Sequence, residues 1–389
     1  MDNFRIVFIG DGMVGWGGGI DYLCQMIGTF SFIDCHYDEL TIEMHLVLRE
    51  YSELSSMYEG AKVLCDNVKK ICDKVQIHLL RNGEDQKKLI LDISPDFCLP
   101  VLSECYRQFS VPYVSYIPDF QSEYLPKFFS TYDIFRRRKK FEYVVTHAPY
   151  IVATSQSVHN DIKKFYPNYT ARVFAQTFAP LSNPVYWDTS EVDTSKYNVA
   201  GDYFIISCQF WQHKNHITAF KAVNELVKSG KDFRLVCTGK MEDYRDINYQ
   251  QDLLKYIEDN KLGNHILMLG YIPKDDQVQL MKDSIAVLQP SLFEGDPGGC
   301  SVYEAVGFGK KVIMSSIDVN LEAEGVAGIS YFEPTDYIGL AKLMRDVLDE
   351  KHEKYSIEKV RKIYEQNSWK AASFYKEMMY EIVGQKREK

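Results

Sequence analysis

The chain contains no apolar run long enough for a membrane-spanning helix, no internal repeat and no low-complexity tract. Its first residues, Met1 to Ile9, lack the basic region and the apolar core of a signal peptide. Its nine cysteines have neither the spacing of a zinc site nor that of a disulfide framework. These absences predict a cytoplasmic protein with reduced cysteines and no bound metal.

The chain also lacks an excess of positive charge, because it contains 45 Lys and Arg residues and 54 Asp and Glu residues. The resulting net charge of −9 argues against general nucleic-acid binding. Apolar residues make up 46% and charged residues 25%, as in soluble globular proteins. A chain of 389 residues is too long for one ordinary core, so we expect two domains.

The stretch from Ser291 to Ser316 has the pattern of a phosphate-binding site. An apolar run before it, Ile285 to Leu288, predicts a buried strand, and a loop with acidic residues and three glycines follows. Helical spacing begins near Cys300, so the loop opens a helix whose unpaired N–H groups and positive dipole can bind a phosphate. Glu304, one turn into this helix, can accept hydrogen bonds from the vicinal hydroxyls of a ribose.

The text SLFEGDPGGCSVYEAVGFGKKVI resembles the signature of retaining GT-B glycosyltransferases of family 4, in which seven residues separate two glutamates. Here the segment between the flanks is two residues longer, so two registers are open. Alignment on the FEG text makes Glu294 the first carboxylate, and alignment on Glu304 makes it Asp296. The resemblance implies that the first carboxylate lies by the donor sugar and Glu304 by the ribose. We favour Glu294; a plain strand-loop-helix with surface acids is the alternative.

The residues between Gly10 and Ile20 form a second glycine-rich loop after a predicted strand. They contain a GxGxxG pattern, but Trp16 and three more glycines precede the helical periodicity, which disfavours a dinucleotide site. The loop is similar to the GGIGRY-type turn of the same glycosyltransferases. That similarity implies that Gly18 and Gly19 let the backbone approach a donor diphosphate, with a plain tight turn as the alternative.

The text IPDFQSEYLPKFFS, residues 117–130, resembles a subset of the family with IPDxQ and LPxFFS. Asp119 matches the acidic position of a His-Asp pair near the donor sugar, and Pro118 stands where many relatives have the histidine. We therefore predict Asp119 as a catalytic-site carboxylate, with a turn-capping aspartate as the alternative. The following run, Arg136 to Lys140, is either a solvated helix face or a cationic lip for an anionic acceptor or phospholipid heads.

The second half of the chain supplies the expected donor contacts. Gln209 and Lys214 have the spacing of the family's arginine and lysine, which implies that Lys214 grips a phosphate while Gln209 can donate only a neutral hydrogen bond. The resemblance also implies nucleobase contacts at Tyr271 and Ile272. His213 and His216 lack a third metal ligand, so they are predicted to cap and pack. The N–H groups expected around the diphosphate belong to the start of the Glu304 helix, at Gly298, Gly299, Cys300 and Ser301.

The pattern of elements predicts an α/β protein, and the resemblance implies the GT-B fold, with two Rossmann-like domains facing across a cleft. We expect an N-terminal domain over residues 1–185, a linker over 186–202, a nucleotide-sugar domain over 203–366 and a returning helix over 367–389. Helices are also predicted over Asp96–Phe109 and, as separate segments near the end, over Ser356–Tyr364 and Ala371–Val383.

These features predict transfer of a hexose-type sugar from a nucleotide-diphosphate sugar to a glycan or lipid-linked acceptor. The resemblance implies retention of configuration and a role in polysaccharide biosynthesis. Neither a DxD-type strand end nor a metal-ligand cluster is seen, so no metal or other cofactor is expected. The missing arginine and histidine keep a catalytically silent sugar- or partner-binding module open, and a nucleotide-sugar epimerase is a further alternative.

Overall fold

The computed structural model describes residues 2–102, 109–243, 245–246, 248–352 and 354–387. Within them, the N-terminal sheet has seven parallel strands in the order β3-β2-β1-β4-β5-β6-β7. These are β1 (Asp2–Ile9), β2 (Leu40–Arg49), β3 (Gln76–Leu80), β4 (Phe97–Val101), β5 (Tyr113–Ile117), β6 (Tyr150–Ala153) and β7 (Arg172–Ala175). The helices between them are α1 (Gly17–His36), α2 (Tyr58–Ile71), α3 (Gln86–Ile93), α4 (Gln121–Tyr124), α5 (Thr131–His147) and α6 (Gln156–Phe165).

The C-terminal sheet has six parallel strands in the order β10-β9-β8-β11-β12-β13 within the described residues. These are β8 (Tyr203–Ser207), β9 (Arg234–Thr238), β10 (Ile266–Gly270), β11 (Ala286–Gln289), β12 (Val312–Ser315) and β13 (Ile329–Phe332). The helices are α7 (His216–Lys228), α8 (Tyr249–Asp259), α9 (Lys274–Asp283), α10 (Gly299–Gly307), α11 (Tyr337–Leu348) and α12 (Ile357–Arg387). Short strands such as β11 and β12 are buried along their whole length, as expected for parallel strands covered by helices on both faces.

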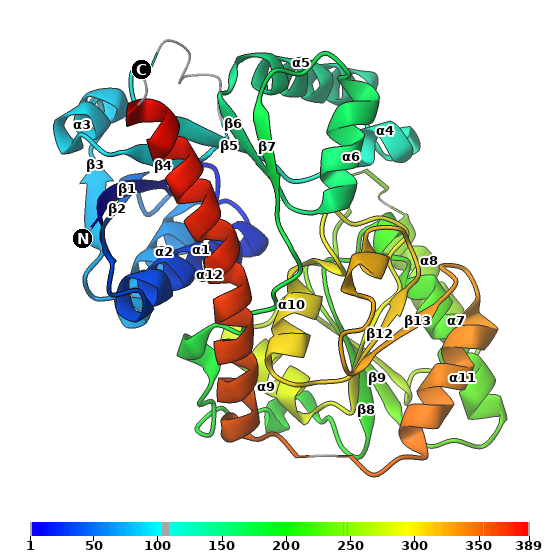
Figure 1. The fold of residues 1–389 in the computed structure, drawn as a ribbon. Helices are drawn as coiled ribbons and strands as arrows, with labels where there is room; N and C mark the ends of the chain where they lie inside the picture. The colour runs from blue at the N-terminus through cyan, green and yellow to red at the C-terminus, as the bar shows by residue number, and fades with distance from the viewer. Residues whose placement is uncertain (1, 103–108, 244, 247, 353, 388–389) are drawn as a thin grey trace.

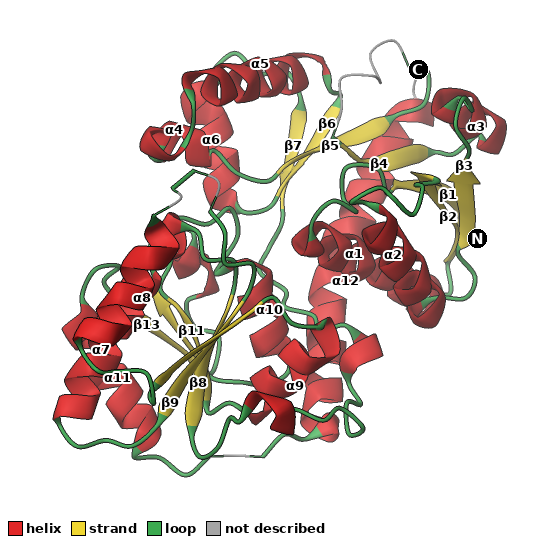
Figure 2. Cartoon of the chain, turned by 180° about the vertical axis from the view of Figure 1, so that it is seen from behind, coloured by secondary structure: helices red, strands yellow, loops and turns green. Residues whose placement is uncertain are grey.

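Each sheet is covered by helices on both faces (Figures 1 and 2). In the N-terminal half, α1, α2 and α12 pack on one face of the sheet, and α3, α5 and α6 pack on the other. In the C-terminal half, α7, α8 and α11 cover one face, and α9 and α10 cover the other. The two halves are therefore built on the same three-layer plan.

Helix α12 belongs to both halves. Val360 near its start is buried in the C-terminal core, whereas Met378, Met379 and Ile382 are buried in the N-terminal core. Figure 1 shows this helix running past both domains beside α1. The two helices predicted near the end of the chain are therefore one helix. Asn367 and Lys370, in the predicted gap, donate to the backbone carbonyls of Pro180 and Phe178, in the segment after β7, and the helix continues through them.

One further prediction of local structure differs from the fold, and one strand was not predicted at all. The helix predicted over Asp96–Phe109 is wrong at its start, where residues 97–101 form β4 with all five residues buried. A run that is apolar at nearly every position fits a central strand as well as a buried helix, and the sheet decides here. Residues 103–108 of that prediction lie outside the described residues. Strand β7, which had no prediction, completes the edge of the N-terminal sheet.

None of the described helices combines the length and the apolar content that a membrane-spanning segment requires.

Candidate functional site

Two loops of the C-terminal domain meet at the carboxyl edge of its sheet. Lys214 follows β8, and Glu294 lies between β11 and α10. The Nζ atom of Lys214 is 2.6 Å from Oε1 of Glu294, and the two side chains are only 14% and 8% exposed. Although burial opposes the charge, Glu294 raises the pKa of Lys214, so this lysine is a cation at neutral pH. The structure thus brings the predicted phosphate cation next to the predicted first carboxylate.

Gln289, the last residue of β11, holds this loop in place and had no predicted role. Its Nε2 donates to Oε1 of Glu294 at 3.1 Å and to the carbonyl of Gly298 at 2.5 Å. Its Oε1 is buried and has no partner among the described residues, and the same is true of the Ser291 hydroxyl. The sequence signal was a polar residue ending an apolar strand directly before Pro290. Unpaired buried polar atoms beside a lysine are what a polar ligand would satisfy.

The loop turns into α10 at two glycines in the left-handed region, Gly298 and Gly299, each with φ of 70°. A Cβ on Gly298 would come within 2.2 Å of the Val302 side chain, so glycine is required there. The N–H of Gly298 donates to Oδ1 of Asn320 at 2.7 Å, and that of Gly299 to the carbonyl of Asp296 at 3.3 Å. Of the four amides predicted to bind phosphate, those of Gly298 and Gly299 are therefore already paired.

The next two amides of α10, those of Cys300 and Ser301, have no hydrogen-bond acceptor within the described part of the chain. They belong to the first turn of the helix, where N–H groups have no intrahelical partner. An anion at this end of α10 would therefore be bound by these two amides.

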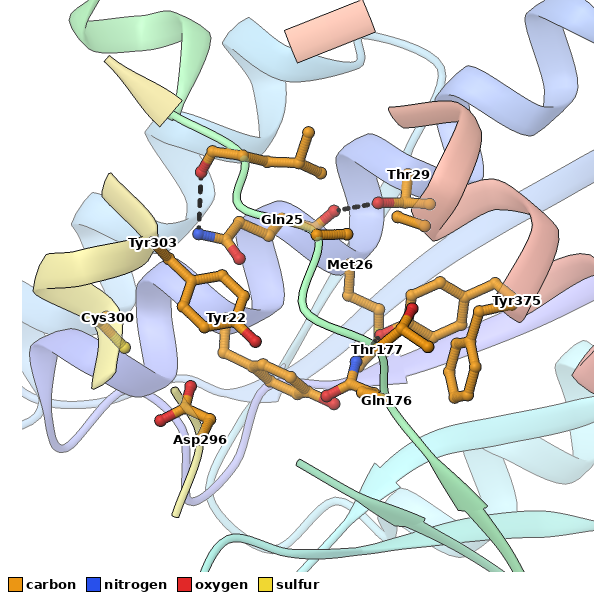
Figure 3. A pocket seen from close by; sticks show the side chains of 14 residues that line it. Tyr22, Gln25, Met26, Thr29, Gln176, Thr177, Asp296, Cys300, Tyr303 and Tyr375 are labelled. Atoms are coloured by element: carbon orange, nitrogen blue, oxygen red, sulfur yellow. Dashed lines mark hydrogen bonds between the residues drawn. The ribbon is translucent and has the colours of Figure 1, made fainter. Parts of the chain in front are cut away.

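Asp296, the carboxylate of the other register, does not contact Lys214. It lines a cavity of about 50 Å³ at the domain interface, together with Cys300 and Tyr303 of α10 and Tyr22 of α1 (Figure 3). Burial, followed by the charge of Glu294, raises the pKa of Asp296 to about 7. Of the two candidate carboxylates, only Glu294 is paired with the predicted phosphate cation.

The glycine turn of the N-terminal domain lies against the start of α10. The thiol Sγ of Cys300 is 3.8 Å from the carbonyl oxygen of Gly18. A Cβ on Gly18 would be 3.1 Å from that sulfur, and one on Gly19 would be 2.5 Å from the carbonyl oxygen of Met13. The structure therefore brings Gly18 and Gly19 to the helix end at which the anion is expected, and glycine allows the close approach.

Asp119 caps the turn that follows it, as in the alternative interpretation. Its Oδ1 accepts from the N–H of Gln121 at 2.8 Å and from Arg137 at 2.6 Å. It is nevertheless beside the Glu294 loop, because a Cβ on Gly295 would come within 3.1 Å of the Asp119 Cβ and 2.0 Å of the Pro118 carbonyl oxygen. Asp119 therefore lies at the interface with a carboxylate oxygen already engaged.

The hydroxyls of Thr154 and Ser155 fix the same contact from β6, because each donates to the carbonyl of Gly295 at 2.8 Å. The glycine of the FEG text thus docks the C-terminal loop on the ends of two N-terminal strands.

The basic run of α5 is only partly free in solvent. Arg137 pairs with Asp119, Arg138 with Glu123 at 2.6 Å and Lys139 with Glu142 at 2.8 Å. Both interpretations of Arg136–Lys140, a solvated helix face and a cationic lip, stay predictions, now with three of the charges paired.

The remaining predicted donor residues differ in exposure. Gln209 is half-buried directly after β8, where Gly239 packs so closely that a Cβ there would be 3.0 Å from the Gln209 backbone nitrogen. Tyr271 follows β10 and is 83% exposed, whereas Ile272 is buried in the core. A nucleobase at this turn could meet the Tyr271 ring and the backbone, but not the Ile272 side chain.

An arginine that sequence reasoning missed lies between the two domains. Arg245, in the loop after β9, donates to Asp243 at 2.9 Å and to Oε1 of Gln121 in the N-terminal domain at 3.3 Å. Its guanidinium lies 4.6 Å from the ring centroid of Trp211 and contacts His213 at 3.4 Å. No motif marks it, because it stands in an acidic, non-periodic loop.

The rings of His213 and His216 are buried, which agrees with the packing role predicted for them. Burial, followed by the charges of Lys214 and Arg245, lowers the pKa of His213 to about 2, and burial lowers that of His216 to about 3. Both rings are therefore neutral at pH 7. In the described ranges, no three His, Cys, Asp or Glu side chains are arranged to hold a metal ion.

Glu304 of α10 belongs to a partly buried ionic cluster at the domain interface. Lys274 of α9 is 3.0 Å from its carboxylate, and Nε2 of Gln277 donates to Oε2 at 3.3 Å. The same ammonium is 3.3 Å from Asp21 of α1, which belongs to the N-terminal domain. Burial raises the pKa of Glu304 and Lys274 opposes that shift.

Residues 193–367 match the family model described as "Glycosyl transferases group 1". Among solved structures, the chain is similar to a glycosyltransferase from Rickettsia africae ESF-5, with a TM-score of 0.65, 15% identity and coverage of 98% of this chain and 99% of that one. It is also similar to HepE of Anabaena in complex with UDP and glucose, with a TM-score of 0.59, 15% identity and coverage of 99% and 98%.

Sucrose-phosphate synthase from Thermosynechococcus elongatus gives a TM-score of 0.61 at 11% identity, with coverage of 99% and 98%. No curated protein sequence is significantly similar to the chain. The structural matches span both domains, and they confirm the predicted GT-B fold.

Proposed function

Since its C-terminal half matches the group 1 glycosyltransferases and its two sheets form a GT-B fold, the chain is a glycosyltransferase, and we propose that it uses a nucleotide-diphosphate sugar as donor. The diphosphate binds between Lys214 and the first turn of α10. The observation that carries the proposal is the Lys214–Glu294 contact of 2.6 Å beside the free amides of Cys300 and Ser301. That HepE of Anabaena was solved with UDP and glucose supports a donor of this class.

The chemistry follows from the charges at this edge of the sheet. The departing diphosphate gains negative charge as the glycosidic bond breaks, and a fixed cation with helix amides stabilises that charge. Lys214 and the α10 amides supply these groups without a metal, and Gln289 keeps Glu294 at the edge of the same site. Glu294 is proposed to position the donor sugar, and transfer is proposed to retain the anomeric configuration. Added EDTA should leave the rate unchanged.

The register of the two carboxylates can be tested directly. Because only Glu294 contacts Lys214, Glu294→Gln should lower the rate of transfer by at least about a hundredfold, as for a group that acts in the transition state. Asp296→Asn should lower it by less than about tenfold, since Asp296 faces the interdomain cavity. The reverse order of effects would assign the role to Asp296.

Donor binding is tested with a panel of UDP-, GDP- and ADP-sugars by thermal shift and isothermal calorimetry. One nucleotide class should raise Tm and bind with micromolar affinity, and Lys214→Ala should abolish the effect. Lys221→Ala, which changes an exposed lysine of the neighbouring helix α7, is the matched control. If Lys214→Ala bound the donor as well as the natural chain, the diphosphate assignment would be wrong.

A lipid-linked acceptor, in the polysaccharide pathways suggested by the sequence resemblance, is proposed from the outer face of α5. Tyr132 and Phe135 are 69% and 59% exposed on that face, and Arg136 follows at the next helical position. Aromatic rings beside a cation suit the headgroup region of an anionic membrane. Co-sedimentation with vesicles containing phosphatidylglycerol should therefore decrease in a Tyr132→Ser, Phe135→Ser double variant.

A catalytically silent binding module is the second candidate. It is favoured by the neutral Gln209 and by the neutralisation of Lys214 by Glu294. A silent module would bind the nucleotide sugar but would not convert it to free nucleotide with any acceptor extract.

A further inference from the structure

The cluster around Glu304 places a lysine where it can control the ribose-binding carboxylate. Both carboxylate oxygens of Glu304 lie 3.0 Å from Nζ of Lys274, and the Glu304 side chain is only 10% exposed. On the other side, Asp21 lies 3.3 Å from the same ammonium. One cation from α9 thus joins a carboxylate of α10 to a carboxylate of α1, across the interface between the domains.

We propose that Lys274 is a positioning residue for the donor nucleoside, fixing the Glu304 carboxylate for the ribose hydroxyls and linking it through Asp21 to the N-terminal domain. This inference rests on the proposed nucleotide-sugar donor. It adds that helix α1, whose first residues lie at the expected diphosphate, also contributes to ribose selection through Asp21. Gln277, with 3.3 Å to Oε2, completes the orientation of the carboxylate.

The charges explain why a lysine is needed. Asp21, Glu304 and Lys274 carry a net charge of −1 in a partly buried site, so without Lys274 two carboxylates would face each other. Burial and Asp21 both favour the neutral form of Glu304, and Lys274 is the largest influence that favours the ionised form. An ionised carboxylate accepts two hydrogen bonds from a ribose diol, whereas a protonated one accepts them less well.

Other titratable groups around the cluster are fixed or distant. The phenol of Tyr186 is buried and has its pKa raised to about 12, so it stays neutral. Burial raises the pKa of the Cys24 thiol, which also stays neutral. Lys282 of α9 is engaged with the carbonyls of Tyr186 and Trp187. Lys274 is therefore the group whose removal changes the state of Glu304.

The test compares the affinity for UDP, GDP or ADP, whichever binds, with the affinity for its 2′-deoxy counterpart. The natural chain should prefer the ribonucleotide by about tenfold, the usual effect of one or two hydrogen bonds to a charged group. Lys274→Met should bring the ratio close to one, mainly by weakening the ribonucleotide, and Lys274→Arg should keep most of the preference. An unchanged ratio in Lys274→Met overturns the inference.

Charge compensation separates an electrostatic role from a purely structural one. In the Lys274→Met, Asp21→Asn double variant burial still favours the neutral form of Glu304, but the facing negative charge is gone, so the ribose preference should return in part. Asp21→Asn alone keeps a hydrogen-bond acceptor for Lys274 and should change the ratio by less than about threefold. A double variant no better than Lys274→Met would overturn the charge argument.

The pH dependence gives an independent readout. Burial raises the pKa of Glu304, and without Lys274 it rises further, so ribonucleotide affinity of Lys274→Met should increase as the pH is raised. Affinity that does not vary with pH in Lys274→Met would contradict this.

The matched control is Lys196→Met, which breaks a 2.7 Å pair with Asp276 on the same helix α9 without reaching Glu304. It should leave the preference for the ribonucleotide unchanged. If the natural chain binds no nucleoside diphosphate at all, the proposed function fails. If it binds one but the ribose preference is insensitive to Lys274, only this inference fails.

Discussion

The two domains present very different polar groups to each other, although both are parallel sheets covered by helices on two faces. On the C-terminal side, Gln289 Oε1, the Ser291 hydroxyl and two amides of α10 lack partners among the described residues. On the N-terminal side, the carboxylate of Asp119 is occupied by Arg137 and a backbone N–H. Buried polar atoms without such a partner also occur on the N-terminal side, at Tyr22, Ser122 and Arg137. The difference therefore lies in the unpaired amides at the start of α10, next to the Lys214–Glu294 loop, where a polar ligand is expected.

The contact that makes this division possible is the docking of Gly295, and breaking it should have the largest effect. In Gly295→Ala the new Cβ would lie 2.0 Å from the Pro118 carbonyl oxygen, so the loop must move away from the N-terminal domain. We expect transfer to fall by about a hundredfold, because a displacement of about 1 Å is enough for such a loss. Steady-state kinetics measures the effect. Gly263→Ala is the control, because a Cβ there meets no neighbour, and equal activity of the two variants would contradict the docking role.

The pH dependence of stability should include a contribution from the Asp296 carboxyl. The pKa of Asp296 is raised to about 7, so the folded chain holds a proton that the unfolded chain releases near pH 4. This contribution to stability is fully present below about pH 4 and is lost as the pH rises through 7, by roughly 4 kcal/mol at most. Urea unfolding of Asp296→Asn should therefore vary less between about pH 5 and 8 than that of the natural chain. Parallel pH profiles of the two proteins would exclude this titration.

The N-terminal core depends on α12 in a way that the C-terminal core does not. Met378 is fully buried among the N-terminal strands and helices, so Met378→Ala should lower the free energy of unfolding by about 3 kcal/mol. The neighbouring Glu377 is exposed, and Glu377→Ala should change it by less than about 0.5 kcal/mol. Chemical denaturation gives both values. Nucleotide affinity of the folded Met378→Ala variant should change little, because Lys214, Glu294, Glu304 and the amides of α10 belong to the other domain.

The smallest effect is expected at the second link between the domains. Arg245→Lys keeps a charge but loses the planar contact with Trp211 and the bond pattern to Asp243 and Gln121. We expect kcat/KM to fall by about threefold to tenfold with little change in nucleotide affinity, as for a group that positions one domain against the other. A large loss of nucleotide affinity would instead place Arg245 in the donor site.

The sequence was sufficient for the parts of the site that are local in the chain. The strand, the glycine loop and the helix around Glu294 and Glu304 follow from periodicity and turn chemistry, and the spacing of Gln209 and Lys214 marked the second loop. The partners that decide whether each of these groups is hydrogen-bonded or ion-paired come from distant segments of the chain. Asn320 takes the amide of Gly298, Lys274 and Asp21 surround Glu304, and Arg137 takes Asp119. No local pattern contains such pairings, because the fold creates them.

The mispredicted elements have the same cause. A run such as residues 97–101 suits either a strand or a buried helix, and only its neighbours in the sheet decide. The continuity of α12 likewise depends on a distant segment, because the carbonyls of Pro180 and Phe178 accept hydrogen bonds from Asn367 and Lys370.

The passage of α12 through both cores has a consequence for how the protein is made. The side chains of Met378, Met379 and Ile382, which fill the core around β1 and α1, are synthesised after every strand of the second sheet. The domain that is synthesised first therefore cannot finish its packing until the second sheet has been made. A chain cut directly after α11 would keep its whole second sheet and still leave the first domain incomplete.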